Sequence, residues 1–137
     1  MKILRKRIIS TVAVLLCLIG LIYMAVYMKS IADYKKAVRE TTFTNIGISD
    51  VPDGVYVGEY DVSVIYAKVE VTVKNGEITN INILEHRNER GKPAEAVINK
   101  IVEEQKIDVD AVSGATNSST VIKKAVENAL SLCLIQH

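Results

Sequence analysis

Several residue types are scarce in this chain of 137 residues: it has no Trp, one Phe, two Cys and two His. Two Cys residues cannot build a disulfide scaffold, and two His residues, one of them the last residue, cannot form a His/Cys metal cluster. The net charge of +1 and the few aromatics argue against a nucleic-acid-binding surface. The charged fraction of 24% and the hydrophobic fraction of 49% exclude wholesale disorder, and the length allows one ordinary domain.

Charge is absent from one long stretch, residues 8–28. As a helix, these 21 residues span about 30 Å, the thickness of the hydrocarbon core of a bilayer. Residues 1–28 carry four Lys or Arg and no acid, whereas the remainder carries 13 basic and 16 acidic residues. The positive-inside bias therefore predicts a single-pass cell-membrane protein, with the basic segment 1–7 in the cytoplasm and residues 29–137 outside.

Two other interpretations of this stretch are weighed against an uncleaved anchor. A buried core helix would be shorter or would carry some charge. A cleaved signal peptide has a shorter apolar region, although residues 30–32 offer a small-residue cleavage site. Beyond the span we expect a stalk and linker over residues 29–50, with residues 30–40 continuing as a helix and residues 41–53 forming a polar linker. The folded domain is expected over residues 51–137.

The first half of that domain has the pattern of a sheet. Residues 55–60 are rich in β-branched and aromatic side chains, and Val69, Val71 and Val73 alternate with polar residues in a strand predicted over 62–74. Asn75-Gly76 is a strong signal for a type I′ hairpin turn. On the return strand Ile78 is out of phase with Ile81 and Ile83, which predicts a bulge or a late strand start. An antiparallel meander of at least three strands follows.

The second half changes to helical spacing. Residues 93–105 predict one helix, residues 107–109 a short extended piece, and residues 118–134 a last helix. The apolar stripe expected on the last helix consists of Val121, Ile122, Ala125, Val126, Ala129, Leu130 and Leu132. Cys133 is expected in the core. Strands followed by helices predict an α+β fold, with the helices on one face of the sheet.

Between these helices, residues 113–120 pack five hydroxyls and one Gly into eight positions. Small residues let a ligand approach the backbone, and the first turn of a helix attracts a phosphate through its unpaired N–H groups. A structural alternative is that Ser118, Ser119 or Thr120 simply caps the helix. Composition alone leaves both open.

The motif Asp-Ala-Val-Ser-Gly-Ala-Thr, residues 110–116, closely resembles the attachment motif of FMN-binding domains. Such domains occur in sodium-pumping NADH:quinone oxidoreductase, in the Rnf complex and in small extracytoplasmic flavoproteins of Gram-positive bacteria. The resemblance extends over about 85 residues and includes the opening segment 53–58, the Asn75-Gly76 hairpin, Glu85-His86, Gly91-Lys92 and Glu104-Gln105.

The resemblance implies that a separate flavin transferase takes FMN from FAD and esterifies its phosphate to the hydroxyl of Thr116. Gly114 and Ala115 would then let the cofactor lie against the backbone. Ser113, Ser118 and Ser119 would donate hydrogen bonds to it, and Ser113 or Ser118 remains open as the ester site. Asp110 would be read by the transferase or would hold the loop.

Other candidates are weaker. Glu85 and His86 could border the flavin, the basic cluster of Arg87, Arg90 and Lys92 with Glu89 could bind phosphate or a partner, and Tyr56, Tyr60 or Tyr66 could stack on the ring. No general base with an oriented nucleophile is visible, so a stand-alone catalyst is not indicated. The resemblance therefore implies a membrane-anchored electron-transfer flavoprotein, passing electrons from a membrane donor to another flavoprotein or an extracellular acceptor. The alternatives are a redox-sensing or assembly domain with non-covalent FMN, and a cofactor-free interaction module.

Overall fold

The computed structural model describes residues 1–87 and 91–135 and divides the chain into two compact units, Met1–Asp33 and Tyr34–His137. The first unit is helical throughout its described length after Met1, as part of α1 (Lys2–Glu40). An 18-residue window of this helix has a mean hydropathy of 2.6 and no buried residue. Length and composition therefore fit a membrane span, and a signal sequence near an N-terminus would fit as well. The buried-core alternative does not agree with this exposure.

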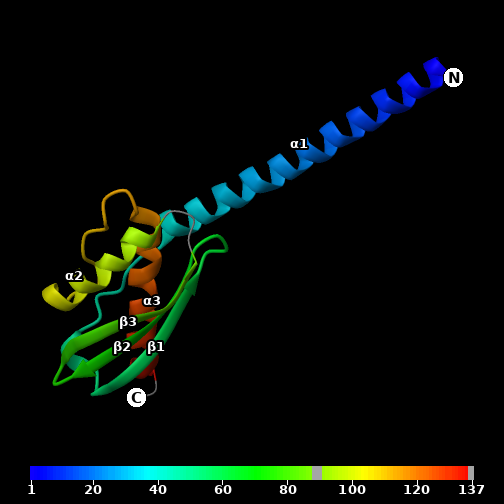
Figure 1. Cartoon of the computed structure of the whole chain (residues 1–137). Helices are drawn as coiled ribbons and strands as arrows, with labels where there is room; N and C mark the ends of the chain where they lie inside the picture. The colour runs from blue at the N-terminus through cyan, green and yellow to red at the C-terminus, as the bar shows by residue number, and fades with distance from the viewer. Residues whose placement is uncertain (88–90, 136–137) are drawn as a thin grey trace. The chain divides into compact units, whose positions relative to one another are not determined.

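The second unit is built on a three-stranded antiparallel sheet in the order β1 (Gly54–Asp61), β2 (Tyr66–Lys74), β3 (Glu77–Arg87) (Figure 1). The predicted hairpin is confirmed, because Asn75 and Gly76 have φ of 55° and 75°. The irregularity expected at Ile78 is also confirmed: Thr72 pairs with Asn80 and Val73 with Ile78, so one residue of β3 is bulged out.

The second strand was predicted over residues 62–74, but β2 begins only at Tyr66. Residues 62–65 form a turn instead, in which the Val62 N–H donates to the Ile65 carbonyl at 2.9 Å and Ser63 adopts a φ of 75°. Apolar residues in this segment gave the strand signal, and Val62 and Ile65 are indeed buried. Burial alone does not distinguish a turn that packs on the core from a strand.

Helices cover the sheet. A 3-10 turn, η2 (Lys92–Ala96), leads into α2 (Val97–Glu104), so the helix predicted from Pro93 starts with a tighter turn. Gln105 ends α2 in the left-handed conformation, and its amide exchanges two hydrogen bonds of 2.8 Å with the backbone of Ile78 on β3. The final helix, α3 (Thr116–Ile135), packs against β1 and β2. The predicted α+β fold is confirmed.

The stripe of α3 differs from the prediction at one position. Val121, Ile122, Ala125, Val126, Ala129 and Leu130 are fully buried, but Leu132 is 56% exposed and was wrongly assigned to the stripe. At about 100° per residue, Leu132 lies on the opposite side from Leu130, whereas Cys133, three positions on, returns to the core as predicted.

Residues between α1 and β1 pack onto this unit. Val38, Ile48 and Val51 are buried, and a short 3-10 helix, η1 (Ile48–Asp50), precedes the sheet. The carboxylate of Glu127 on α3 accepts a hydrogen bond of 3.0 Å from the Thr44 N–H, and Lys124 donates one of 2.8 Å to the Thr42 carbonyl. The segment predicted as a polar linker is thus held to α3 at two points.

Candidate functional site

A tight turn precedes α3. The Ala115 N–H donates to the Val112 carbonyl at 3.0 Å, which places Ser113 and Gly114 in the two central positions. Gly114 has a φ of 79°, the conformation that a type II turn requires at its third residue. A Cβ added at Gly114 would meet no atom within 4 Å. The turn therefore needs glycine for its backbone conformation and leaves open space where a side chain would stand.

The start of α3 carries no capping side chain. The helix begins at Thr116, and its first backbone bond runs from the Ser119 N–H to the Ala115 carbonyl at 3.0 Å. Alanine offers no side-chain oxygen, and within residues 1–87 and 91–135 no acceptor takes the N–H groups of residues 116–118. This terminus has both the open donors and the partial positive charge that attract an anion.

The capping alternative was wrong, since Ser118, Ser119 and Thr120 lie inside α3. Ser119 is fully buried: its hydroxyl donates to the Ala115 carbonyl at 2.8 Å and accepts from the Val112 N–H at 3.0 Å. The Thr120 hydroxyl donates to the Thr116 carbonyl at 3.0 Å. Ser119 therefore ties the turn to the helix, and both functions of its hydroxyl are used within the protein.

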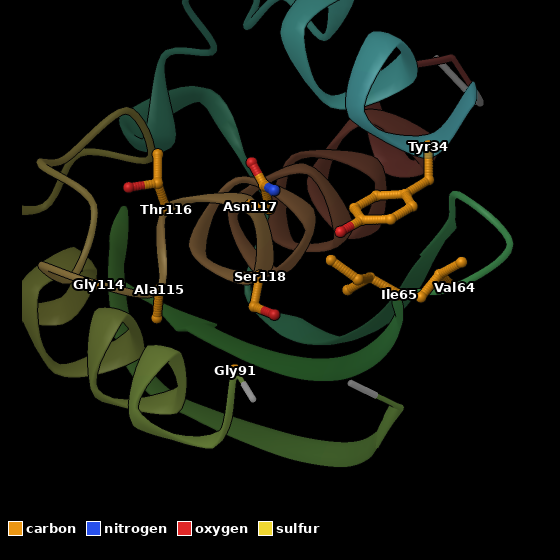
Figure 2. Close-up of a pocket in the computed structure, with 9 residues that line it drawn as sticks. All are labelled: Tyr34, Val64, Ile65, Gly91, Gly114, Ala115, Thr116, Asn117 and Ser118. Atoms are coloured by element: carbon orange, nitrogen blue, oxygen red, sulfur yellow. The ribbon is translucent and has the colours of Figure 1, made fainter. Parts of the chain in front are cut away.

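A pocket of about 360 Å³ opens beside this turn and the helix start (Figure 2). Its volume lies at the lower end of the range of roughly 300–1,000 Å³ found for small-molecule sites. It is lined by Tyr34, Val64, Ile65, Gly91, Gly114, Ala115, Thr116, Asn117 and Ser118. The consecutive residues 114–118 thus form one wall. Gly91 and three apolar or aromatic residues from earlier segments, Tyr34, Val64 and Ile65, complete the lining.

Four residues predicted for cofactor binding line this pocket: Gly114, Ala115, Thr116 and Ser118. The Thr116 side chain is exposed, whereas Ser118 is buried. In Figure 2 the Thr116 hydroxyl points away from Tyr34, and the Ser118 hydroxyl points towards Ile65.

Three other residues predicted for cofactor binding in this region, Asp110, Ser113 and Ser119, do not line it. Asp110 and Ser113 are exposed on the preceding loop and turn, and Ser119 is buried beneath them.

The candidate residues at the end of β3 contact other protein groups and not the pocket. The ring of His86 is 1% exposed, and its Nδ1 lies 3.1 Å from the carboxylate of Glu95. Arg87 donates to the Ser63 carbonyl at 2.9 Å and stacks over Tyr66 at 5.5 Å from the ring centre. Neither lines the pocket, and Glu85 and Lys92 are exposed. Glu89 and Arg90, the remaining members of the predicted basic cluster, lie outside the described residues.

The three strand tyrosines also lie away from the pocket. Tyr56 donates to the Pro52 carbonyl at 2.5 Å, and the Tyr60 hydroxyl lies 2.9 Å from the Thr41 hydroxyl. The Tyr66 hydroxyl donates to the Glu59 carboxylate at 2.7 Å, and this bond raises the pKa of Tyr66 to about 12. All three tyrosines therefore have a structural role, through packing and hydrogen bonds within the protein.

The sequence did not predict the residues that line the pocket opposite the motif, Tyr34, Val64 and Ile65. Tyr34 lies in the last turns of α1, in a segment predicted as stalk, and Val64 and Ile65 lie in the turn predicted as strand. One available signal was the helical spacing of Tyr34, Ala37 and Val38, which places an apolar face on the helix beyond the membrane span. All three pack against the domain core.

An α+β domain with an open glycine turn and an uncapped helix start is suited to binding a phosphorylated cofactor. Residues 65–131 match the model of the family described as the FMN-binding domain. A search of curated proteins finds no match. The match includes the motif and most of the pocket lining, so the folded unit contains an FMN-binding domain of this family. The chain joins this domain to a candidate N-terminal membrane anchor.

Proposed function

We propose that this domain carries electrons on the outer face of the membrane, through FMN joined to Thr116 by a phosphoester. One observation carries the proposal: Thr116 is an exposed hydroxyl residue that lines the pocket at the uncapped start of α3. No hydrogen bond engages its side-chain hydroxyl within the described part of the chain. That hydroxyl is thus available to an external enzyme.

The attachment would need a flavin transferase as partner. The Thr116 oxygen forms the new bond to the FMN phosphorus of FAD, the pyrophosphate bond breaks, and AMP leaves while the hydroxyl proton passes to base or solvent. Ser118 is buried and Ser113 stands outside the pocket lining, so both are less accessible or less well placed than Thr116.

The residues of the site suit this cofactor. The N–H groups of residues 116–118 can hold the phosphate, Gly114 leaves room beside the backbone, and Ser118 can donate to phosphate or ribityl oxygens. Bound FMN would supply one- and two-electron chemistry, which is the cofactor's own. A covalent tether prevents its loss where no cytosolic pool can replace it. The electron donor would be a membrane protein, and the acceptor another flavoprotein or an extracellular compound.

Mass measurement after denaturation tests the attachment. The full chain is expressed with a flavin transferase as wild type, Thr116→Ala and the matched control Thr116→Ser. We expect the wild type and the Ser variant to carry the mass of one FMN less one water, and the Ala variant to carry none. Thr116 lies in the first turn of a helix, where alanine is well tolerated, so the fold should survive.

Two further variants sharpen the result. Ser113→Ala and Ser118→Ala should keep the adduct. An adduct that persists in Thr116→Ala and disappears in either serine variant would move the ester site. Flavin that is released from the wild type on denaturation would instead indicate the non-covalent sensor, and a colourless protein would indicate the interaction module.

A further inference from the structure

Tyr34 closes the side of the pocket opposite the motif. It lies in the last turns of α1, within the second unit and 31 positions before the region that matches the family model. Figure 2 shows its ring reaching into the pocket, with the hydroxyl directed towards Ser118 and Ile65. The pocket therefore receives an aromatic wall from a segment that the family match does not cover.

The lining of the pocket is divided by chemistry. On one side stand the backbone donors and hydroxyls of residues 114–118, and on the other stand Tyr34, Val64 and Ile65. FMN is divided in the same way, with a charged phosphate at one end and an aromatic ring system at the other. Once the phosphate is placed at the start of α3, the ring system is directed towards the apolar side.

Contacts outside the pocket hold Tyr34 in position. Val38, one helical turn later, is buried in the core, and the Thr41 hydroxyl donates to the Ala37 carbonyl at 2.8 Å while lying 2.9 Å from the Tyr60 hydroxyl. Lys124 and Glu127 bind the backbone of the next residues. The Tyr34 ring is therefore part of a wall formed before any ligand binds.

We propose that Tyr34 is the aromatic residue that contacts the flavin ring, so that the last turns of α1 complete the cofactor site. This inference rests on the proposed function, because the phosphate position sets the direction of the ring. Tyr56, Tyr60 and Tyr66 do not line the pocket, and no Trp is present in the sequence. Tyr34 is the one aromatic residue in the described lining.

Flavin fluorescence tests this contact without relying on activity. A tyrosine in contact with an excited flavin quenches its emission by donating an electron, which then returns, and phenylalanine does not. Tyr34→Phe keeps the ring, and within the described residues no hydrogen bond to the Tyr34 hydroxyl would be lost. Tyr66→Phe is the matched control on β2, outside the pocket.

The full-length variants are loaded by the transferase, and intact mass first establishes that each carries FMN. At equal loading, we expect Tyr34→Phe to fluoresce several-fold more strongly per flavin, Tyr34→Trp to restore quenching, and Tyr66→Phe to match the wild type. Equal emission from Tyr34→Phe and the wild type would overturn the proposal, as would an equal rise in Tyr66→Phe.

Failure of the covalent attachment is distinguishable from failure of this contact. If no variant carries an adduct, free FMN is titrated into the unloaded full-length proteins. Stronger quenching by the wild type than by Tyr34→Phe would support the Tyr34 contact although the ester had failed. Equal quenching, or no binding, would overturn the contact as well.

Discussion

Replacing Ser119 with alanine tests whether this residue holds the turn or serves the cofactor. The hydroxyl is fully buried and joins the Val112 N–H to the Ala115 carbonyl. Its removal leaves the Ala115 carbonyl with its other donor, the Ser119 N–H at 3.0 Å. The Val112 N–H, in contrast, loses its acceptor, the Ser119 hydroxyl on α3.

The expected loss of unfolding free energy in Ser119→Ala follows from the Val112 N–H, which is left without an acceptor. A buried polar group left without its partner costs about 1–3 kcal/mol. Alanine is a better helix former than serine by about 0.5 kcal/mol, which offsets part of the loss. Because Val112 is half-buried, water can reach the N–H in part, and we expect a net destabilisation of about 1–2 kcal/mol.

Chemical unfolding of the full-length apoprotein in mild detergent measures this free energy. Ser131→Ala is the matched control, since its hydroxyl only donates to the Glu127 carbonyl at 2.8 Å on the same helix. The Ser131→Ala variant gains the same helix propensity as Ser119→Ala, but it leaves no N–H group without an acceptor. If both variants unfold with the same free energy, the turn-holding role of Ser119 is refuted. A defect seen only in FMN-loaded protein would indicate direct cofactor binding.

Two predictions concern the sheet. Gly58→Ala should destabilise the domain by about 3 kcal/mol, the upper end of overpacking, because the new Cβ would lie 2.3 Å from both the Ala125 carbonyl oxygen and the Ala129 nitrogen. Thermal unfolding checks this, and an unchanged Tm would contradict the close approach of β1 to α3. The hydrogen bond to Glu59 raises the folded-state pKa of Tyr66 to about 12 from an ordinary value of 10.0. Its contribution to stability is therefore fully present below pH 10 and is lost as the pH rises through 12. Ultraviolet titration of phenolate should show a tyrosine that titrates near pH 12 in the wild type and is missing in Tyr66→Phe. Wild-type and Tyr66→Phe curves that coincide in this late phase would refute the assignment.

Local patterns predicted the strands and helices because each depends on a few neighbouring residues. Period-two alternation identified β2, and Asn75-Gly76 identified the hairpin, since both conformations need only local backbone geometry. The errors fall where tertiary contact overrides local signals. The segment 62–65 forms a turn in which Val62 and Ile65 are buried, although its sequence resembles a strand, and Leu132 is exposed although it is apolar.

In the candidate site, too, the contiguous features were predictable from the sequence, whereas the contacts between distant segments were not. The sequence by itself determined the motif, the glycine turn and the helix that follows, because these are contiguous. It could not distinguish Ser118 from Ser119, whose surroundings differ only once the turn folds back onto α3. Nor could it bring Tyr34 to the motif 80 positions later. Only packing of distant segments on a common core decides which hydroxyls face the pocket and which aromatic ring lines it, because side-chain direction depends on what lies against each element.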